Sequence, residues 1–213
     1  MSQETSNANA PATGGGGGGG FWQGFETWKS PPAKDVAPIP KVGARAPSSL
    51  KLILPNGRPT LVVFLRHCGC PFAEKTFRSL VAMSNKYKDV RCVAISHSSA
   101  AATDEWLPKV GGSWTVNVIV DEARDLYAQW GLGISSTWHV ANPMTLWSAV
   151  RLAKDEDIWN SNTASGSRWQ MGGAFAVDRD GTVRWEHVAR TADDIPHLEA
   201  AIESLGVEPS PKH

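Results

Sequence analysis

The chain has 213 residues, enough for one domain with a tail, and its 21 basic side chains balance its 21 acidic ones. A chain without net charge has no long-range attraction to nucleic acid or to an anionic membrane, so neither is expected as a partner. Its three cysteines are too few for a disulfide framework, and no apolar run is long enough to cross a bilayer. Because the N-terminal residues lack the apolar stretch of a secretory signal, a cytoplasmic location is expected.

The composition divides the chain into four parts. Residues 1–20 contain a run of seven glycines and predict a disordered tail, because such a segment buries too little apolar surface to offset its ordering entropy. Residues 21–48 form an aromatic and proline-rich linker, whose large side chains we expect to dock on the domain itself. The domain occupies residues 49–206, and residues 207–213 form a C-terminal tail.

Strand and helix patterns alternate along the domain. The predicted strands are residues 50–54, 60–66, 90–96, 115–120, 173–177 and 182–187, with a hairpin turn at Asn56-Gly57. One predicted helix starts at Pro71, and the others span residues 101–110, 121–130, 143–152 and 192–205. This order indicates an α/β, thioredoxin-like fold, in which a central mixed sheet has helices on both faces and a helical insertion precedes the final hairpin.

The segment from Arg66 to Pro71 carries the strongest chemical signal. It joins a buried strand to a helix, and ligand sites in such sheets lie beyond the carboxyl ends of the strands. Cys70 precedes the proline and should cap the helix, where orphan backbone N–H groups and the helix dipole stabilise a thiolate. With Arg66 and His67 nearby, we expect a lowered pKa at Cys70. The alternative is a small apolar residue buried at a helix start.

Cys68 lies two residues before Cys70, which puts their Cα atoms roughly 5.5–7 Å apart, partly within the range of a disulfide. Gly69 gives the backbone the freedom to close such a ring. One hypothesis is that Cys68 resolves an oxidised Cys70, and the other is that it is an incidental thiol. A metal site at His67, Cys68 and Cys70 is not expected, because structural zinc usually takes four protein ligands and no second cluster follows.

The third cysteine and the other histidines have weaker patterns. Cys92 should lie about 13 Å below the carboxyl end of its strand, at the usual rise per residue, and is expected to be an inert core residue. His97 falls at that carboxyl end and would face the site, although a surface-loop histidine is the commoner case. His139 and His187 have no distinguishing spacing.

Three stretches of the chain resemble one known family. They are LVVFLRHCGCPFAEKTFRSL at 61–80, GLGIS at 131–135, and RWQMGGAFAVDRDGTVRWEHVARTADDIP at 168–196. All three are similar to the AhpC/TSA-type peroxiredoxin-like family, in the branch that includes prostamide/prostaglandin F synthase. The resemblance covers most of residues 45–206 and implies a thioredoxin fold, an antioxidant thiol chemistry, and no bound metal or cofactor.

The chain departs from that family around the reactive position. Many members carry C-P-F-C at the helix start, whereas here Ala73 replaces the second cysteine and leaves Cys68 as the nearest other thiol. The peroxidase motif P-x-x-x-T-x-x-C, counted back from Cys70, is also absent. His67 stands at its threonine position and Val63 at its proline position.

The later part of the resemblance points to a second side of the site. The peroxidatic arginine of the family would fall near Gly172, and Arg168 is the nearest candidate to replace it. Gly172 and Gly173 occupy the stretch of the thioredoxin cis-proline, and without side chains they let a substrate approach the backbone. The insertion before them forms either an aromatic wall beside Cys70 or an ordinary packed helix. Its tryptophans are Trp138, Trp147, Trp159 and Trp169.

These observations favour a thiol-dependent oxidoreductase of peroxiredoxin-like type. Cys70 would attack a peroxide, an endoperoxide or a disulfide, and Cys68 or an external thiol of the thioredoxin or glutathione type would resolve the product. The residues expected to activate the thiol or bind the small-molecule substrate are Arg66, His67, Arg168 and Gly172. Two alternatives stay open: a tailoring enzyme for a specialised metabolite held by the tryptophan-rich insertion, and a non-catalytic thioredoxin-like binding module.

Overall fold

The computed structural model describes residues 31–32, 34–135, 143–159, 161, 163 and 165–211. The predictions for residues 1–20, for the aromatic side chains at 21–28, and for Trp138 and His139 fall outside these ranges. Within them, no helix is both long enough and apolar enough to cross a membrane.

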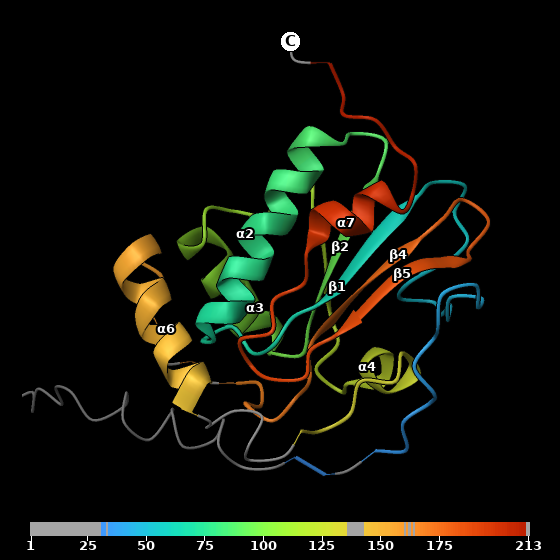
Figure 1. The fold of residues 1–213 in the computed structure, drawn as a ribbon. Helices are drawn as coiled ribbons and strands as arrows, with labels where there is room; N and C mark the ends of the chain where they lie inside the picture. The colour runs from blue at the N-terminus through green and yellow to red at the C-terminus, as the bar shows by residue number, and fades with distance from the viewer. Residues whose placement is uncertain are drawn as a thin grey trace, which may run out of the picture.

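A mixed five-stranded sheet forms the centre of the domain (Figure 1). The strands are β1 (Thr60–Phe64), β2 (Arg91–Ser96), β3 (Asn117–Val120), β4 (Gly173–Val177) and β5 (Val183–Val188), in the spatial order β3-β2-β1-β4-β5. The pairs β1–β2 and β2–β3 are parallel, and the pairs β1–β4 and β4–β5 are antiparallel. The three parallel strands therefore end at one edge of the sheet, and the loop after β1 carries Arg66 to Cys70 to that edge.

Side chains of successive strand residues pack on opposite faces of the sheet, as the two-residue period of a strand requires. Leu61 and Val63 of β1 belong to the core on the side of three helices. Those helices are α2 (Pro71–Lys86), α3 (Ala100–Lys109) and α7 (Leu198–Glu203). Val62 and Phe64 belong to the opposite core, which includes residues of α4 (Asp125–Gln129). The thioredoxin-like α/β fold, with helices on both faces, is thus confirmed.

The start of α2 lies where the Cys70-Pro71 junction predicts. Cys70 has an extended backbone (φ −85°, ψ 124°) and is the N-cap residue. Pro71 takes the first helical position, where its missing N–H breaks no intrahelical bond. Phe77 and Leu80 are fully buried against the sheet and fix the helix in place.

The predicted insertion is α6 (Pro143–Glu156), a helix beside the N-terminal end of α2 and outside the layers of the sheet (Figure 1). Polar contacts attach it to the body. Thr145 and Ser148 donate hydrogen bonds from their hydroxyls to the two carboxylate oxygens of Asp193, at 2.7 and 2.9 Å. One ion pair also joins α6 to α2. Most of the apolar side chains of α6 are therefore not part of the main core.

The predicted strand at residues 50–54 and the hairpin at Asn56-Gly57 are wrong. These residues form an irregular segment, in which the Leu52 N–H donates to the Ser49 carbonyl. Leu52 and Leu54 are buried in the core on the α4 side without pairing to a strand. Their apolar character reflects this burial.

Two predicted helices are shorter than expected. The helix predicted at 121–130 is limited to α4. The buried Asp121 carboxylate accepts the Leu126 N–H at 2.8 Å and so caps a helix that begins at Asp125. The closing helix at 192–205 shrinks to α7, because Pro196 lacks an N–H and disfavours helical geometry in the residue before it.

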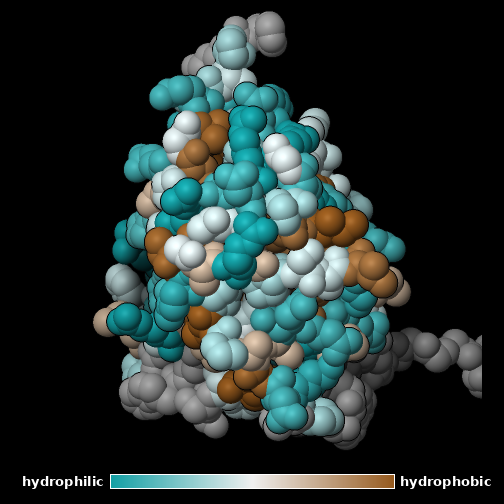
Figure 2. Space-filling view, turned by 90° about the vertical axis from the view of Figure 1, so that its right-hand side faces the viewer, coloured by the Kyte–Doolittle hydropathy of each residue, from teal (hydrophilic) through white to brown (hydrophobic). Residues whose placement is uncertain are grey.

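Residues 34–48, which the composition assigns to a linker, run along the outside of the domain. Ala37 donates its N–H to a carbonyl of α4, and Gly43 donates its N–H to a carbonyl of β5. On the face shown in Figure 2, hydrophobic residues form small separate patches among hydrophilic ones. The larger exposed apolar side chains of α6 include Met144, Leu146, Trp147 and Val150.

Candidate active site

Cys70 lies in a tight turn between β1 and α2. Its N–H donates to the His67 carbonyl at 3.0 Å, and its own carbonyl accepts the Glu74 N–H, the first bond of the helix. The residue is only 5% exposed. It nevertheless lines a cavity of about 400 Å³, called the Cys70 cavity below. A ligand in this cavity would meet Cys70 at the N-terminus of α2, where backbone N–H groups favour an anion.

Cys68 has different surroundings. Its sulfur lies 3.7 Å from the Ser96 hydroxyl and 3.8 Å from the Thr103 hydroxyl, and those two hydroxyls are 2.9 Å apart. Its N–H donates to the Ser98 hydroxyl. Cys68 is 4% exposed, unbonded to another cysteine, and absent from the lining of the Cys70 cavity. To reach Cys70 it would have to leave this hydroxyl cluster.

Arg66 and Arg168 meet beside the cavity. Nη2 of Arg66 donates to the Arg168 carbonyl at 2.5 Å, and both side chains line the cavity. Arg66 is 6% exposed, and its Nε and Nη1 have no hydrogen-bond partner in the described part of the chain. Burial lowers the pKa of the Arg168 guanidinium, and a negative charge on Cys70 opposes that shift. Arg168 is therefore close enough to stabilise a thiolate at Cys70.

His67 also lines the cavity, and it is held neutral. Burial keeps its pKa well below the ordinary value, and the charges of Arg168 and Arg66 act in the same direction. Its Nδ1 accepts the Gly69 N–H at 3.2 Å, so the ring proton of the neutral form lies on Nε2. His67 can thus donate one hydrogen bond from Nε2 without carrying a charge.

The opposite wall of the cavity is apolar and comes from the insertion. α6 contributes Leu146, Ala149, Val150 and Ala153, and Trp159 follows the helix. The aromatic wall that the sequence suggests is thus represented here by Trp159. Trp147 faces away, exposed, with the Arg151 guanidinium 5.7 Å from its ring centre.

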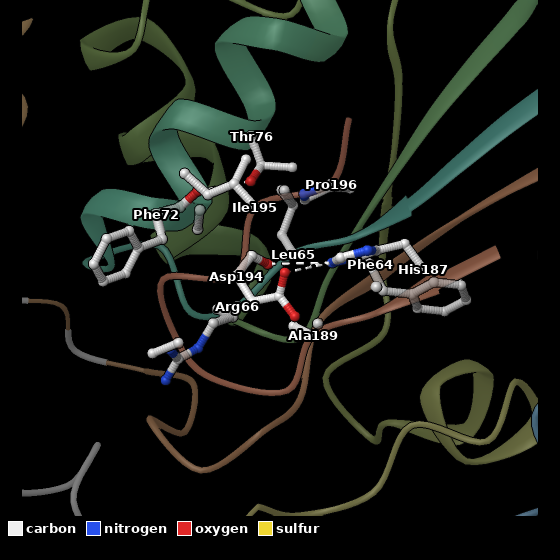
Figure 3. Close-up of a pocket in the computed structure, with 14 residues that line it drawn as sticks. Phe64, Leu65, Arg66, Phe72, Thr76, His187, Ala189, Asp194, Ile195 and Pro196 are labelled. Atoms are coloured by element: carbon white, nitrogen blue, oxygen red, sulfur yellow. Dashed lines mark hydrogen bonds and ion pairs between the residues drawn. The ribbon is translucent and has the colours of Figure 1, made fainter. Parts of the chain in front are cut away.

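Gly172 lines a second, smaller cavity of about 20 Å³, room for about one water molecule (Figure 3). A Cβ on Gly172 would lie 2.9 Å from the Phe64 carbonyl oxygen, so the glycine permits close packing onto β1. His187 and Asp194 point toward each other there, 3.1 Å apart, and the Arg66 side chain extends away from them (Figure 3). Arg66 lines both cavities.

Residues 165–168, called the strap below, form the segment that places Arg168 at the site. Ser99 donates its N–H to the Ser165 hydroxyl, and the Ser98 hydroxyl donates to the Ser165 carbonyl. Gly166 has a left-handed backbone (φ +87°), and a Cβ there would lie 2.8 Å from the His67 Cβ. The strap therefore packs directly on His67 and on the loop after β2, through contacts between segments far apart in sequence that no local pattern could have predicted.

His97 contacts the strap, and the sequence interpretation undervalued it. The surface-loop prediction is wrong: His97 is buried, and its Nε2 accepts the Ser167 N–H at 3.0 Å. Burial lowers its pKa to about 4. Its place at the carboxyl end of β2 was the signal for this role. Cys92 lies in the core, where burial raises its pKa to about 12 and makes it an unreactive thiol.

Of the predicted site residues, the structure brings Arg66, His67, Cys70 and Arg168 together around one cavity. Comparison with known proteins gives the family. The model of the AhpC/TSA antioxidant enzymes matches residues 77–191. The chain belongs to the AhpC/TSA antioxidant enzyme family. The match begins after Cys70, so it covers neither Cys68 nor Cys70, and it does not single out the prostamide/prostaglandin F synthase branch.

Three solved structures share the fold at low sequence identity. A peroxiredoxin-like protein from Aquifex aeolicus has a TM-score of 0.55 and 13% identity, over 79% of this chain and 88% of that one. A thiol peroxidase from Chromobacterium violaceum has a TM-score of 0.55 and 14% identity, over 82% and 91%. A peroxiredoxin 6 mutant of Arenicola marina has a TM-score of 0.56 and 13% identity, over 78% and 72%. No curated protein sequence matches the chain.

Proposed function

We propose that this AhpC/TSA-family protein is a thiol peroxidase that reduces an organic peroxide through Cys70. The observation that supports this proposal is the place of Cys70, at the N-cap of α2 and in the lining of a cavity that Arg168 shares. A helix N-terminus and a nearby cation both favour the thiolate, which is the nucleophilic form. Neither Cys68 nor Cys92 lines that cavity.

In the first step, the Cys70 thiolate attacks the terminal oxygen of the peroxide. A sulfur–oxygen bond forms, the oxygen–oxygen bond breaks, and Cys70 becomes a sulfenic acid. The leaving alkoxide takes a proton from water and departs as an alcohol. Arg168 stabilises the negative charge, and Nε2–H of the neutral His67 donates a hydrogen bond to the leaving oxygen.

An external thiol completes the cycle. One thiol condenses with the sulfenic acid, releases water and leaves a mixed disulfide, and a second thiol displaces Cys70 from it. Cys70 returns to the thiol, and the two external thiols leave as a disulfide. Cys68 is the other candidate for the resolving thiol, but its contacts with Ser96 and Thr103 would have to break first.

The test is consumption of cumene hydroperoxide with dithiothreitol as the reductant. We expect turnover by the wild type and by Cys92→Ser, the matched control, and none by Cys70→Ser. Retention of turnover in Cys68→Ser assigns resolution to the external thiol, whereas its loss assigns resolution to Cys68. Turnover by Cys70→Ser equal to that of the wild type would contradict the proposal and favour a tailoring enzyme or a binding module.

A further inference from the structure

The Cys70 cavity carries an excess of positive charge. Its described lining includes the cations Arg66, Arg168 and Lys154, and no aspartate or glutamate. A thiolate at Cys70 balances one of these charges. Arg66 and Lys154 also line the cavity, and the reduction of a neutral peroxide requires neither of these two charges.

Arg66 is a buried cation in the lining of this cavity. A buried guanidinium with two unpaired N–H groups is costly, because each buried donor without a partner loses about 1–3 kcal/mol. Nη2 donates to the Arg168 carbonyl of the strap, while Nε and Nη1 are buried without a partner among the described residues. Because the guanidinium of Arg66 lines the cavity, its positive charge favours a carboxylate bound there.

The rest of the cavity fits an apolar body of limited size. The wall of α6 and Trp159 offers hydrocarbon and an aromatic ring, with no acidic group among the described residues. A volume of about 400 Å³ holds roughly a dozen non-hydrogen atoms, taking about 30 Å³ for each as for a water molecule in the liquid.

We infer that the cavity takes a carboxylate attached to an apolar body of about a dozen non-hydrogen atoms, such as a medium-chain or aryl acid. Arg66 binds the carboxylate, and Lys154 at the exposed edge of α6 adds attraction. This inference rests on the proposed role of the Cys70 cavity as the substrate site. It adds the chemical class of the substrate, a hydroperoxide that also carries a carboxylate.

Binding without turnover is the first test. Isothermal titration of Cys70→Ser with decanoate and with 1-decanol compares two ligands of the same length and different charge. We expect decanoate to bind at least about tenfold more tightly, because hydrogen bonds to charged groups contribute about 1.5–3 kcal/mol each. Equal affinity for the two ligands, or no binding of decanoate, overturns the inference.

Variants locate the recognition. Arg66→Gln should abolish the preference for decanoate, with circular dichroism to verify folding. Lys154→Gln, at an exposed position, should weaken decanoate binding a few-fold and leave 1-decanol binding unchanged. The matched control is Lys88→Gln, beyond the opposite end of α2. A preference that survives both Arg66→Gln and Lys154→Gln contradicts the assignment.

A second assay separates the inference from the proposed function. Cumene hydroperoxide and its para-carboxylate are offered to the wild type at equal concentration, and kcat/KM is compared. Preference for the carboxylate supports both claims. Equal kcat/KM values leave the peroxidase standing and overturn the inference, whereas tight decanoate binding with no consumption of either peroxide overturns the peroxidase and leaves the carboxylate site standing.

Discussion

Gly69 is the position where a single added methyl group tests the packing of the site. An alanine Cβ there would lie 2.2 Å from the carbonyl oxygen of Ser161, and 3.2 Å from the Thr163 Cγ2. Gly69 has no left-handed backbone, so Gly69→Ala introduces the clash without backbone strain. The Ser161 oxygen belongs to the backbone and cannot rotate away, and the Ser161 N–H donates to the Gly69 carbonyl at 3.1 Å.

The size of the effect follows from this distance. The Ser161 backbone must retreat by roughly 1 Å, and overpacking of this kind costs about 1–3 kcal/mol of the free energy of unfolding. The same retreat uncovers the loop of Cys70. We therefore expect Gly69→Ala to lower the free energy of unfolding in urea by that amount and to speed the alkylation of Cys70 by iodoacetamide.

The matched control is Gly133→Ala, whose Cβ would meet only the end of the Val36 side chain, at 3.3 Å. That methyl group can shift, so the control should stay within about 0.5 kcal/mol of the wild type. If Gly69→Ala matches the wild type in both stability and alkylation rate, the Ser161 segment does not pack on the Cys70 loop, and the reasoning fails.

Three further predictions concern charges and thiols away from Cys70. His97 has a pKa of about 4 in the folded protein and 6.5 when unfolded, so the unfolded chain holds the extra proton between these values. Stability should fall by about 3 kcal/mol as the pH drops through that window, and urea titrations should show a smaller fall in His97→Gln. Cys92, with a pKa of about 12, should resist iodoacetamide at pH 8 in the native protein and react only in urea, as peptide mass spectrometry can show. Asp193→Asn replaces one of the two carboxylate oxygens that accept hydrogen bonds from α6, so amide hydrogen exchange in α6 should accelerate several-fold. Asp89→Asn, at an exposed position, is the control and should leave that exchange unchanged.

Local sequence patterns predicted the framework of the site. The apolar run before Arg66 and the proline after Cys70 give the strand, the loop and the helix start, because these features depend on neighbouring residues alone. The position of His97 at the end of its strand was also visible. Its burial was not, because the strap that covers it comes from a distant part of the chain.

Other features depend on tertiary contacts that no local pattern records. Cys68 is adjacent to Cys70 in sequence, yet its side chain faces Ser96 and Thr103 while Cys70 lines the cavity. Leu52 and Leu54 are buried by packing rather than by strand pairing. Gly172, expected to bind a substrate, lies close to the Phe64 carbonyl of β1 and lines a smaller cavity together with Arg66.

The most direct test of the central claim is to treat the reduced wild-type protein with one equivalent of cumene hydroperoxide in the presence of dimedone, which traps sulfenic acids. Peptide mass spectrometry then shows which cysteine carries the adduct. The account predicts the adduct at Cys70 and none at Cys92, since only Cys70 lines the cavity. An adduct confined to Cys68, or no adduct on any cysteine while peroxide disappears, would contradict it.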